Sequence, residues 1–216
     1  MASTAGSIAV IDYGMGNLRS VWQALVHVAD GRDVVVTADP AVVAAAERVV
    51  FPGQGAMPDC MRELDARGLR QVVLETARTK PFLGICIGLQ MLFEHSDEGD
   101  VSGLGVFAGN VRRFAAERMV NASGEKLKVP HMGWNEVRQI RQHPLWSGIP
   151  DGARFYFVHS YCVTPGDADC IAGMTDYGTP FTSVVARDNI FAIQCHPEKS
   201  AKAGLALLSN FLQWKP

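Results

Sequence analysis

The chain has 216 residues and a formal net charge of -2, with 48% hydrophobic and 19% charged residues. This length allows one large α/β domain or two small ones, and the charge balance lacks the basic footprint of a nucleic-acid binder. No segment approaches the ~18 uninterrupted apolar residues of a membrane-spanning helix, so we expect a cytoplasmic protein. The five cysteines contain no C-x-x-C pair, which argues against a disulfide framework and a structural zinc site.

Strands and helices alternate over the first half of the chain. Apolar runs predict buried strands at residues 8–12, 33–37, 48–51 and 81–85, and helical spacing predicts helices at 18–28, from 40, at 69–76 and at 89–94. Units of this kind build a parallel sheet with helices on both faces, and ligands bind beyond the carboxyl ends of its strands. We therefore expect the loops 13–17 and 52–58 and the turn at Cys86 to gather at that edge.

Beyond residue 100 the pattern changes to strands. We predict strands at 105–114, 127–129, 154–159 and 170–174, and a hairpin of 181–187 and 190–195 across Asp188-Asn189. An amphipathic last helix, 201–214, covers one face of the sheet. Because no shift in composition marks a linker, we predict one α/β domain, 1–216, with a mostly parallel central sheet flanked by helices and antiparallel strands in the second half.

A strand-to-helix turn carries the pattern Gly84-x-Cys86-x-Gly88. This is the sulfur counterpart of the nucleophile elbow, in which the reactive side chain is exposed on a strained turn. Glycine is needed on both sides because a Cβ would collide with the neighbouring strand and helix. The turn also places the sulfur at a helix N-terminus, which favours thiolate over thiol. A cysteine in this setting is a candidate nucleophile, whereas most unpaired cysteines are core residues.

Two further glycine-rich loops have different interpretations. Gly14-x-Gly16 suggests a dinucleotide site, but Arg19 stands where the fingerprint requires glycine and no acidic residue ends the second strand, so we reject it. The loop from Pro52 to Gly55 follows a buried strand and leaves its amides free. Beside a nucleophile elbow, such amides predict an oxyanion hole, formed by Gly53, Gln54, Gly55 and the Ile87 amide.

The predicted hairpin ends in Gln194-Cys195-His196-Pro197-Glu198. Side chains alternate along a strand, so Cys195 points away from His196 and is expected in the core. His196 supplies a base, and Glu198, beyond a proline that fixes the bend, can accept the far N–H of its imidazole. Cys86, His196 and Glu198 together have the parts for acyl transfer: a thiolate nucleophile, a proton-transferring imidazole and a carboxylate that orients it.

These motifs resemble the class I, triad-type glutamine amidotransferases, which hydrolyse glutamine to glutamate and ammonia on a flavodoxin-like fold. The triad stretches, GICIGLQ at 84–90 and HPE at 196–198, carry that likeness. The chain is further similar to the members of this family that serve as glutaminase subunits in histidine biosynthesis, through DYGMGNL at 12–18, PGQGA at 52–56, PHMGWN at 130–135, FYFVHSY at 155–161 and PEKS at 197–200. An aromatic residue is more usual at Cys195, but a core position makes this of little consequence.

The resemblance implies roles for single residues. Cys86 would be the nucleophile, His196 the acid and base, and Glu198 the orienting group. Gln90 would contact the substrate glutamine, with the backbone of Ser160 and Tyr161 at its α-amino and α-carboxylate ends. The resemblance also implies no cofactor, no metal, and a (β/α)8-barrel cyclase as partner in a heterodimer. The matching positions near the docking face are Asn17, Trp134, Tyr156 and Lys199.

Three alternatives stay open at this point. An amidotransferase subunit serving aminobenzoate or pyridoxal phosphate synthesis would share the triad but lack the 130–135 and 155–161 stretches. A stand-alone cysteine hydrolase of related fold would act without a partner. A catalytically silent interaction module is the non-enzyme alternative, and the intact Cys86, His196 and Glu198 argue against it.

Overall fold

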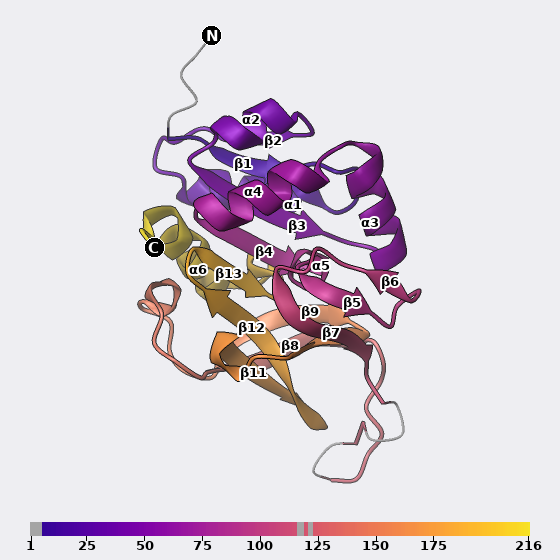
Figure 1. The fold of residues 1–216 in the computed structure, drawn as a ribbon. Coiled ribbons are helices and arrows are strands. Elements are labelled where there is room, and N and C mark those ends of the chain that lie inside the picture. Colours follow the sequence, from indigo (N-terminus) through magenta and orange to yellow (C-terminus); the bar gives the residue numbers. More distant parts are fainter. Residues whose placement is uncertain (1–5, 116–118, 121–122) are drawn as a thin grey trace.

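The computed structural model describes residues 6–115, 119–120 and 123–216 (Figure 1). Its helices are α1 (Leu18–Val28), α2 (Pro40–Ala45), α3 (Met57–Ala66), α4 (Arg70–Thr79), α5 (Ile87–Met91) and α6 (Ala201–Gln213), with short 3-10 turns at η2 (Pro144–Trp146), η3 (Ala168–Cys170) and η4 (Pro197–Lys199). Its strands are β1 (Ile8–Ile11), β2 (Val34–Thr37), β3 (Arg48–Gly53), β4 (Phe82–Cys86), β5 (Phe93–Ser96), β6 (Val101–Ser102), β7 (Phe107–Arg113), β8 (His131–Gln139), β9 (Ala153–His159), β10 (Tyr161–Pro165), β11 (Ile171–Tyr177), β12 (Thr179–Arg187) and β13 (Ile190–Ile193).

Among the described residues the strands form one connected sheet in the order β2-β1-β3-β4-β13-β12-β10-β7-β5-β6, with β11, β8 and β9 branching from β12. The run from β2 to β13 is parallel, and β12, β10 and β7 continue it as antiparallel neighbours. The predicted α/β fold, with a parallel centre and antiparallel strands from the second half, is confirmed. The predicted hairpin is β12 and β13, and its second strand lies at the centre of the sheet beside β4.

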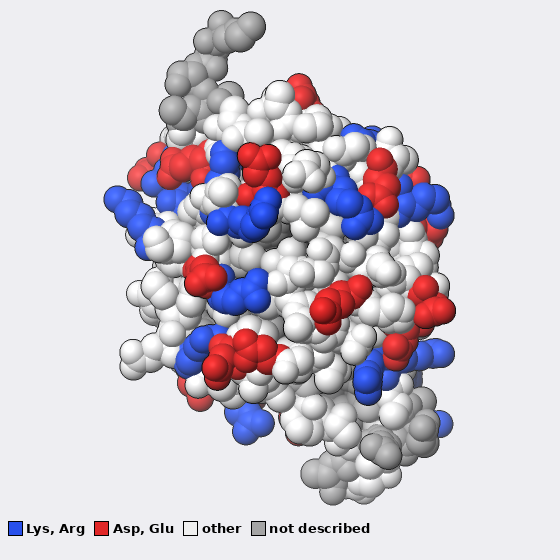
Figure 2. Space-filling view, in the orientation of Figure 1, with Lys and Arg blue, Asp and Glu red and all other residues white. Residues whose placement is uncertain are grey.

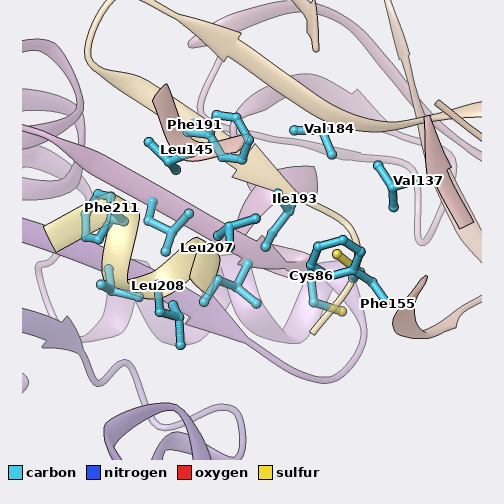
Figure 3. Close-up of a cluster of buried hydrophobic side chains, with 14 of the residues drawn as sticks. Cys86, Val137, Leu145, Phe155, Val184, Phe191, Ile193, Leu207, Leu208 and Phe211 are labelled. Atoms are coloured by element: carbon cyan, nitrogen blue, oxygen red, sulfur yellow. The ribbon is translucent and has the colours of Figure 1, made fainter. Parts of the chain in front are cut away.

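Two layers of buried hydrophobic side chains cover the two faces of the sheet. Helices α1 and α6 pack on one face, with Leu25 and Leu207 among the buried residues. Helices α2, α3 and α4 cover the other, where Val43 and Val73 are buried. Figure 3 shows the first layer, with Cys86 at one end of the cluster and the α6 side chains further along it. The candidate nucleophile is therefore held against a packed core.

The surface carries both signs of charge. Figure 2 shows acidic and basic side chains interspersed over one face, in agreement with the net charge of -2. Within the part of the chain that the structure describes, no helix has both the length and the apolar character needed to cross a membrane.

Helix α3 was not among the predicted elements. Its buried residues, Met57, Cys60, Met61 and Leu64, follow helical spacing, and Pro58 lies in its first turn, where a missing N–H costs nothing. The apolar positions alone would have predicted the helix. Because Pro58 lies beside the glycine-rich loop, the prediction instead extended that loop to residue 58.

The predicted helix at 89–94 is wrong in its second half. Helix α5 ends at Met91, and the chain continues as β5, parallel to β7. The Met91 carbonyl, which a longer helix would pair with residue 95, accepts the Leu104 amide at 2.8 Å, and the Phe93 carbonyl accepts the Gly105 amide at 3.1 Å. Pairing with a later segment therefore overrides the local helical preference.

The predicted strand at 127–129 is also wrong. Only Lys126 forms an isolated bridge there, with Val120. Leu127 and Val129 are apolar because they pack against the core cluster, not because they join a ladder. Strands β8 and β10, which were also not predicted, both follow this segment in the chain and pair with β9 and β7 respectively.

Candidate active site

The β4–α5 turn forms a strained elbow around Cys86. This residue has φ +56° and ψ -114°, outside the regions that L-residues usually occupy, and only 7% of its surface is exposed. A Cβ on Gly88 would overlap the Phe51 carbonyl oxygen of β3, and one on Gly84 would lie 2.9 Å from the Ala192 side chain of β13. Both glycines of the predicted elbow are therefore required by the close approach of the two neighbouring strands.

The sheet brings His196 to the same edge as Cys86. Strand β13 runs parallel to β4 with Ile193 opposite Ile85, so the residues after both strands emerge together. The His196 amide donates to the Tyr156 carbonyl at 2.8 Å, which fixes the backbone after the strand. Its Nδ1 lies 2.9 Å from Glu198 Oε1, and its buried Nε2 has no hydrogen-bond partner among the described residues. The predicted histidine–carboxylate pair is thus formed.

The electrostatics of this pair favour a charged imidazole. Burial favours the neutral form, but the nearby Cys86 and Glu198 outweigh it and raise the pKa of His196 to about 10. Cys195, beside it in the chain, is fully buried, and burial raises the pKa of its thiol well above the usual range. Its predicted core position is confirmed, and Cys86 is the cysteine that opens on a pocket.

A pocket of about 280 Å³ opens beside Cys86. It brings together most of the residues predicted to contact substrate or stabilise an oxyanion, namely Gln54, Gly55, Ile87, Gln90, Ser160 and Tyr161. Gly53 lies directly opposite Cys86 in the β3–β4 ladder. A smaller hollow behind it is lined by Asn17, Gly53, Gln54, His196 and Glu198. The three loops predicted to gather at the carboxyl edge therefore do so.

The side chain of Gln90 is held in one orientation. Its Nε2 donates to the Tyr161 carbonyl at 3.1 Å and to Gln194 Oε1 at 2.9 Å, and the residue is 3% exposed. Its Oε1 is buried and has no partner among the described residues. A buried acceptor without a partner is costly, so this oxygen is an open acceptor on a residue that lines the pocket.

Three of the four residues predicted at a docking face lie together. Trp134 and Tyr156 are opposite each other in the β8–β9 ladder, with ring centroids 6.3 Å apart, and Lys199 Nζ lies 5.8 Å from the Tyr156 ring. Trp134 is 44% exposed, which is unusual for so large an apolar side chain. Asn17 lies on the other side of the triad, at the hollow that contains Glu198.

Two polar residues at the site were not singled out from the sequence. Gln194 is fully buried, accepts from Gln90 and directs its Nε2 toward Cys86 Sγ at 3.8 Å. The sequence offered one signal for it: a glutamine at the end of an otherwise apolar predicted strand. Glu98 lines the pocket and accepts the Met57 amide at 2.9 Å. It follows β5, whose first two residues fell in the predicted helix and which was not predicted as a strand, so the place of Glu98 at the edge of the sheet could not be foreseen.

The geometry brings a candidate nucleophile and candidate hydrogen-bond donors to one pocket, and a histidine–carboxylate pair to a hollow that shares Gln54 with it. These are the parts expected of a cysteine-dependent acyl transferase. Among the described residues no group of three or more histidine, cysteine, aspartate or glutamate side chains could hold a metal ion.

Solved structures share this fold. A putative GMP synthase subunit of Thermoplasma acidophilum superposes with a TM-score of 0.70 at 18% identity, covering 96% of this chain and 92% of that one. A glutamine amidotransferase of Thermotoga maritima gives a TM-score of 0.61 at 16% identity, covering 91% and 78%. At such identities the likeness concerns the fold alone.

Other known proteins are much more similar to this chain in sequence. The model of the family "Glutamine amidotransferase class-I" matches residues 9–214. The imidazole glycerol phosphate synthase subunit HisH of Dechloromonas aromatica is 71% identical over the full length of both chains. The subunit of the same name from Aromatoleum aromaticum is 69% identical over 97% of this chain and 99% of its own. The chain therefore belongs to the class-I glutamine amidotransferases, within the group formed by these HisH subunits of imidazole glycerol phosphate synthase.

Proposed function

We propose that this chain is the glutamine amidotransferase subunit of an imidazole glycerol phosphate synthase, with Cys86, His196 and Glu198 as its catalytic triad. The observation that carries the assignment of residues is the strained Cys86 elbow beside a buried His196–Glu198 pair at one sheet edge. The 71% identity to a HisH subunit supports the histidine pathway over an amidotransferase of another pathway. The family match over residues 9–214 supports one amidotransferase domain spanning 1–216.

The geometry supports a two-step acyl transfer. The Cys86 thiolate attacks the side-chain carboxamide carbon of glutamine, and the resulting tetrahedral intermediate collapses as the protonated His196 gives its proton to the leaving ammonia. This leaves a glutamyl thioester and a neutral imidazole. His196 then takes a proton from water, whose oxygen attacks the thioester and releases glutamate and the thiolate. Glu198 holds the imidazole at Nδ1 and stabilises its charged form in both steps.

The oxyanion of both intermediates needs hydrogen-bond donors. The backbone amides of the Gly53-Gln54-Gly55 segment and of Ile87 are the candidates, since Gln54, Gly55 and Ile87 line the pocket with Cys86. For substrate, the unpartnered Gln90 Oε1 supplies an acceptor, and the backbone of Ser160 and Tyr161 forms the facing wall. Glu98, on the same wall, supplies a carboxylate for the α-ammonium group of glutamine.

The ammonia is handed to a cyclase subunit, which uses it to make imidazole glycerol phosphate and an aminoimidazole carboxamide ribotide. We propose a (β/α)8-barrel for this partner, bound as a heterodimer over the face formed by Asn17, Trp134, Tyr156 and Lys199. The exposed indole of Trp134 supports a docking role, because tryptophan is enriched among residues that dominate interface energies. All five cysteines are free thiols, which supports a reducing, cytoplasmic location.

The test uses the complex with the cyclase and its ribonucleotide substrate. Cys86→Ala should abolish synthesis from glutamine and leave synthesis from added ammonium intact, because the nucleophile serves only the glutaminase half. Cys170→Ala, a buried cysteine outside the pocket, is the matched control and should retain both activities. Loss of both activities in a Cys86→Ala complex that still assembles would show that Cys86 is structural.

A further inference from the structure

Two buried histidines form a hydrogen-bonded pair at the wall of the glutamine pocket. His131 on β8 and His159 on β9 are opposite each other in the antiparallel ladder, and they are 2% and 6% exposed. His131 Nδ1 lies 3.0 Å from His159 Nε2, so one proton is shared between the two rings. His159 also lines the pocket beside Cys86. The mechanism proposed above uses neither histidine.

The direction of this hydrogen bond is fixed by Asn135. Its Oδ1 accepts the Glu136 amide at 2.8 Å and its Nδ2 donates to the Asp176 carbonyl at 2.8 Å, which together set the orientation of the side-chain amide. The same Nδ2 faces His131 Nε2 at 3.3 Å, so that ring nitrogen must accept. A neutral His131 then carries its proton on Nδ1 and donates it to His159 Nε2.

The donor-to-acceptor order of these hydrogen bonds continues from His159 to the pocket. Because His159 Nε2 accepts, the proton of this ring is on Nδ1, which lies 2.8 Å from the Tyr161 carbonyl oxygen and donates to it. The same carbonyl accepts Gln90 Nε2. Donors and acceptors are therefore matched from Asn135 Nδ2 to Gln90 Nε2, and the last acceptor is the Tyr161 backbone oxygen that orients the Gln90 side chain.

The surroundings keep both rings neutral and immobile. His131 stacks on Tyr177 and Phe157, with ring centroids 4.0 and 4.9 Å away, and His159 packs against Phe114 and Phe181, each at 5.1 Å. Burial lowers the pKa of His131 to about 4 and that of His159 to about 3. At neutral pH each ring therefore carries the single proton that the arrangement requires.

We propose that His131 and His159 are positioning residues for the glutamine pocket, a hydrogen-bonded relay that starts at Asn135 and holds the Tyr161 carbonyl and, through it, Gln90. The proposal rests on the glutaminase function proposed above. His131, Trp134 and Asn135 line one hollow of about 700 Å³. The relay thus connects the predicted docking face to the substrate wall through matched hydrogen bonds.

The kinetic test measures glutamate release by the complex with the cyclase and its ribonucleotide. In His131→Phe an aromatic ring remains between Tyr177 and Phe157, but both hydrogen bonds are lost. Because the relay acts on substrate binding, KM for glutamine should rise about fivefold, the effect of one net hydrogen bond, while kcat changes little. The matched control is His143→Phe, a histidine packed on Phe191 and Trp214 outside the pocket, which should leave KM unchanged.

A structural test needs no activity. Nitrogen chemical shifts of the imidazoles in the complex should show both His131 and His159 protonated on Nδ1, whereas free histidine prefers Nε2. Asn135→Ala removes the donor to His131 Nε2 and should raise KM, while the Tyr161 carbonyl, which can only accept, should keep both rings protonated on Nδ1. This residue is only half-buried, so the variant decides the question if His131→Phe does not fold.

The outcomes distinguish failure of the proposed relay from failure of the proposed glutaminase function on which it rests. A KM that rises in His131→Phe or Asn135→Ala but not in His143→Phe supports the relay. An unchanged KM, an equal rise in the control, or Nε2–H tautomers in the unmutated protein overturn it. A complex that releases no glutamate from glutamine refutes the proposed function instead, and the tautomers then still decide whether the relay exists.

Discussion

His196 Nδ1 lies 2.9 Å from Glu198 Oε1, and the two side chains are only 5% and 2% exposed. Only Pro197 separates the two residues: His196 is the N-cap of the 3-10 turn η4, and Glu198 lies within that turn, after the end of β13. A buried carboxylate next to an imidazole stabilises the protonated ring, and it selects the tautomer whose free nitrogen is Nε2. The pair therefore keeps Nε2 of His196 available on the side of Cys86.

Replacing the carboxylate should weaken catalysis less than removing the nucleophile. In Glu198→Gln the amide still accepts from His196 Nδ1 in one orientation, but the charge that stabilises the imidazolium is lost. We expect glutamine-dependent kcat to fall by about 10²–10⁴-fold, whereas Cys86→Ala should leave no thioester chemistry. Steady-state glutamate release measures both. Glu75→Gln, on α4 outside the site, is the control. A loss in Glu198→Gln equal to that in Cys86→Ala would contradict a carboxylate that only orients and stabilises the imidazole.

A methyl group at the second elbow glycine should destabilise the protein. In Gly88→Ala the new Cβ meets the Phe51 carbonyl oxygen, a backbone atom of β3 that cannot rotate away. The free energy of unfolding should fall by about 2–3 kcal/mol, as for other overpacked sites. Urea unfolding followed by circular dichroism measures it. In Gly166→Ala the Cβ would be 3.5 Å from Ala108, an ordinary contact, so similar losses in the two variants would contradict the steric explanation.

Acidification should destabilise the protein through its buried histidines. Burial lowers the pKa of His131 and His143 to about 4 and that of His159 to about 3, below the value near 6.5 of an unfolded chain. The unfolded state therefore binds more protons between these values, so this stability is present above pH 6.5 and is lost as the pH falls toward 4. Each group should cost about 1–2 kcal/mol between pH 7 and pH 5.

Urea unfolding at pH 7, 6 and 5 checks this expectation. His143→Phe removes one of the three groups, so its free energy of unfolding should depend less steeply on pH than that of the unmutated protein. A stability that is constant or rises on acidification to pH 5 would show that these imidazoles are already charged in the folded state.

The isolated chain should be a poor glutaminase that its partner activates. Gln54 is exposed between Gly53 and Gly55, and Gly55 has φ +121°, so the intervening peptide can rotate at little cost. If its amide points away from the pocket in the free chain, one oxyanion donor is missing, which costs about 3 kcal/mol, or two orders of magnitude in rate. The loop 13–17 contacts this segment, since a Cβ on Gly16 would lie 3.4 Å from the Gln54 amide nitrogen. A partner bound there can favour the active orientation.

Glutamate release should therefore be measured for the chain alone, with the cyclase, and with cyclase plus ribonucleotide. We expect the rate to rise at each step. Trp134→Ala should weaken the association and reduce the increase without changing the rate of the chain alone, because the indole is exposed on the outer side of β8. Equal rates under the three conditions would contradict partner activation and favour a stand-alone hydrolase.

Much of the site could be predicted because its chemistry is local in sequence. Two short patterns carried the prediction: the glycines on both sides of Cys86, and His196 two residues before Glu198. Each has a single physical explanation, and the structure places the three residues of the proposed triad together. The parallel strands were predicted for a similar reason, since β1, β3 and β4 are continuous apolar runs. These parts of the molecule are specified by neighbours along the chain.

The errors arose where distant segments decide the structure. Strand β8 carries glycine, asparagine and glutamate, and its middle is half-exposed, so neither propensity nor alternation marks it. Strand β5 follows a short helix, and that helix ends where the chain pairs with residues 104–105 and with β7. Because β5 was missed, Glu98 was missed, and because β8 was missed, the pairing of His131 with His159 could not be foreseen.

The place of β13 in the sheet has a consequence for how the protein is made. This strand, at residues 190–193, inserts between β4 and β12, so the centre of the sheet stays open until these residues have been synthesised. His196 and Glu198 come three and five residues after its end. A growing chain that has not yet reached β13 contains Cys86, but it lacks both the base proposed for it and the strand that brings this base to the sheet edge. Such an unfinished copy is therefore expected to leave glutamine intact, because the Cys86 thiol has not yet acquired the neighbours proposed to act with it.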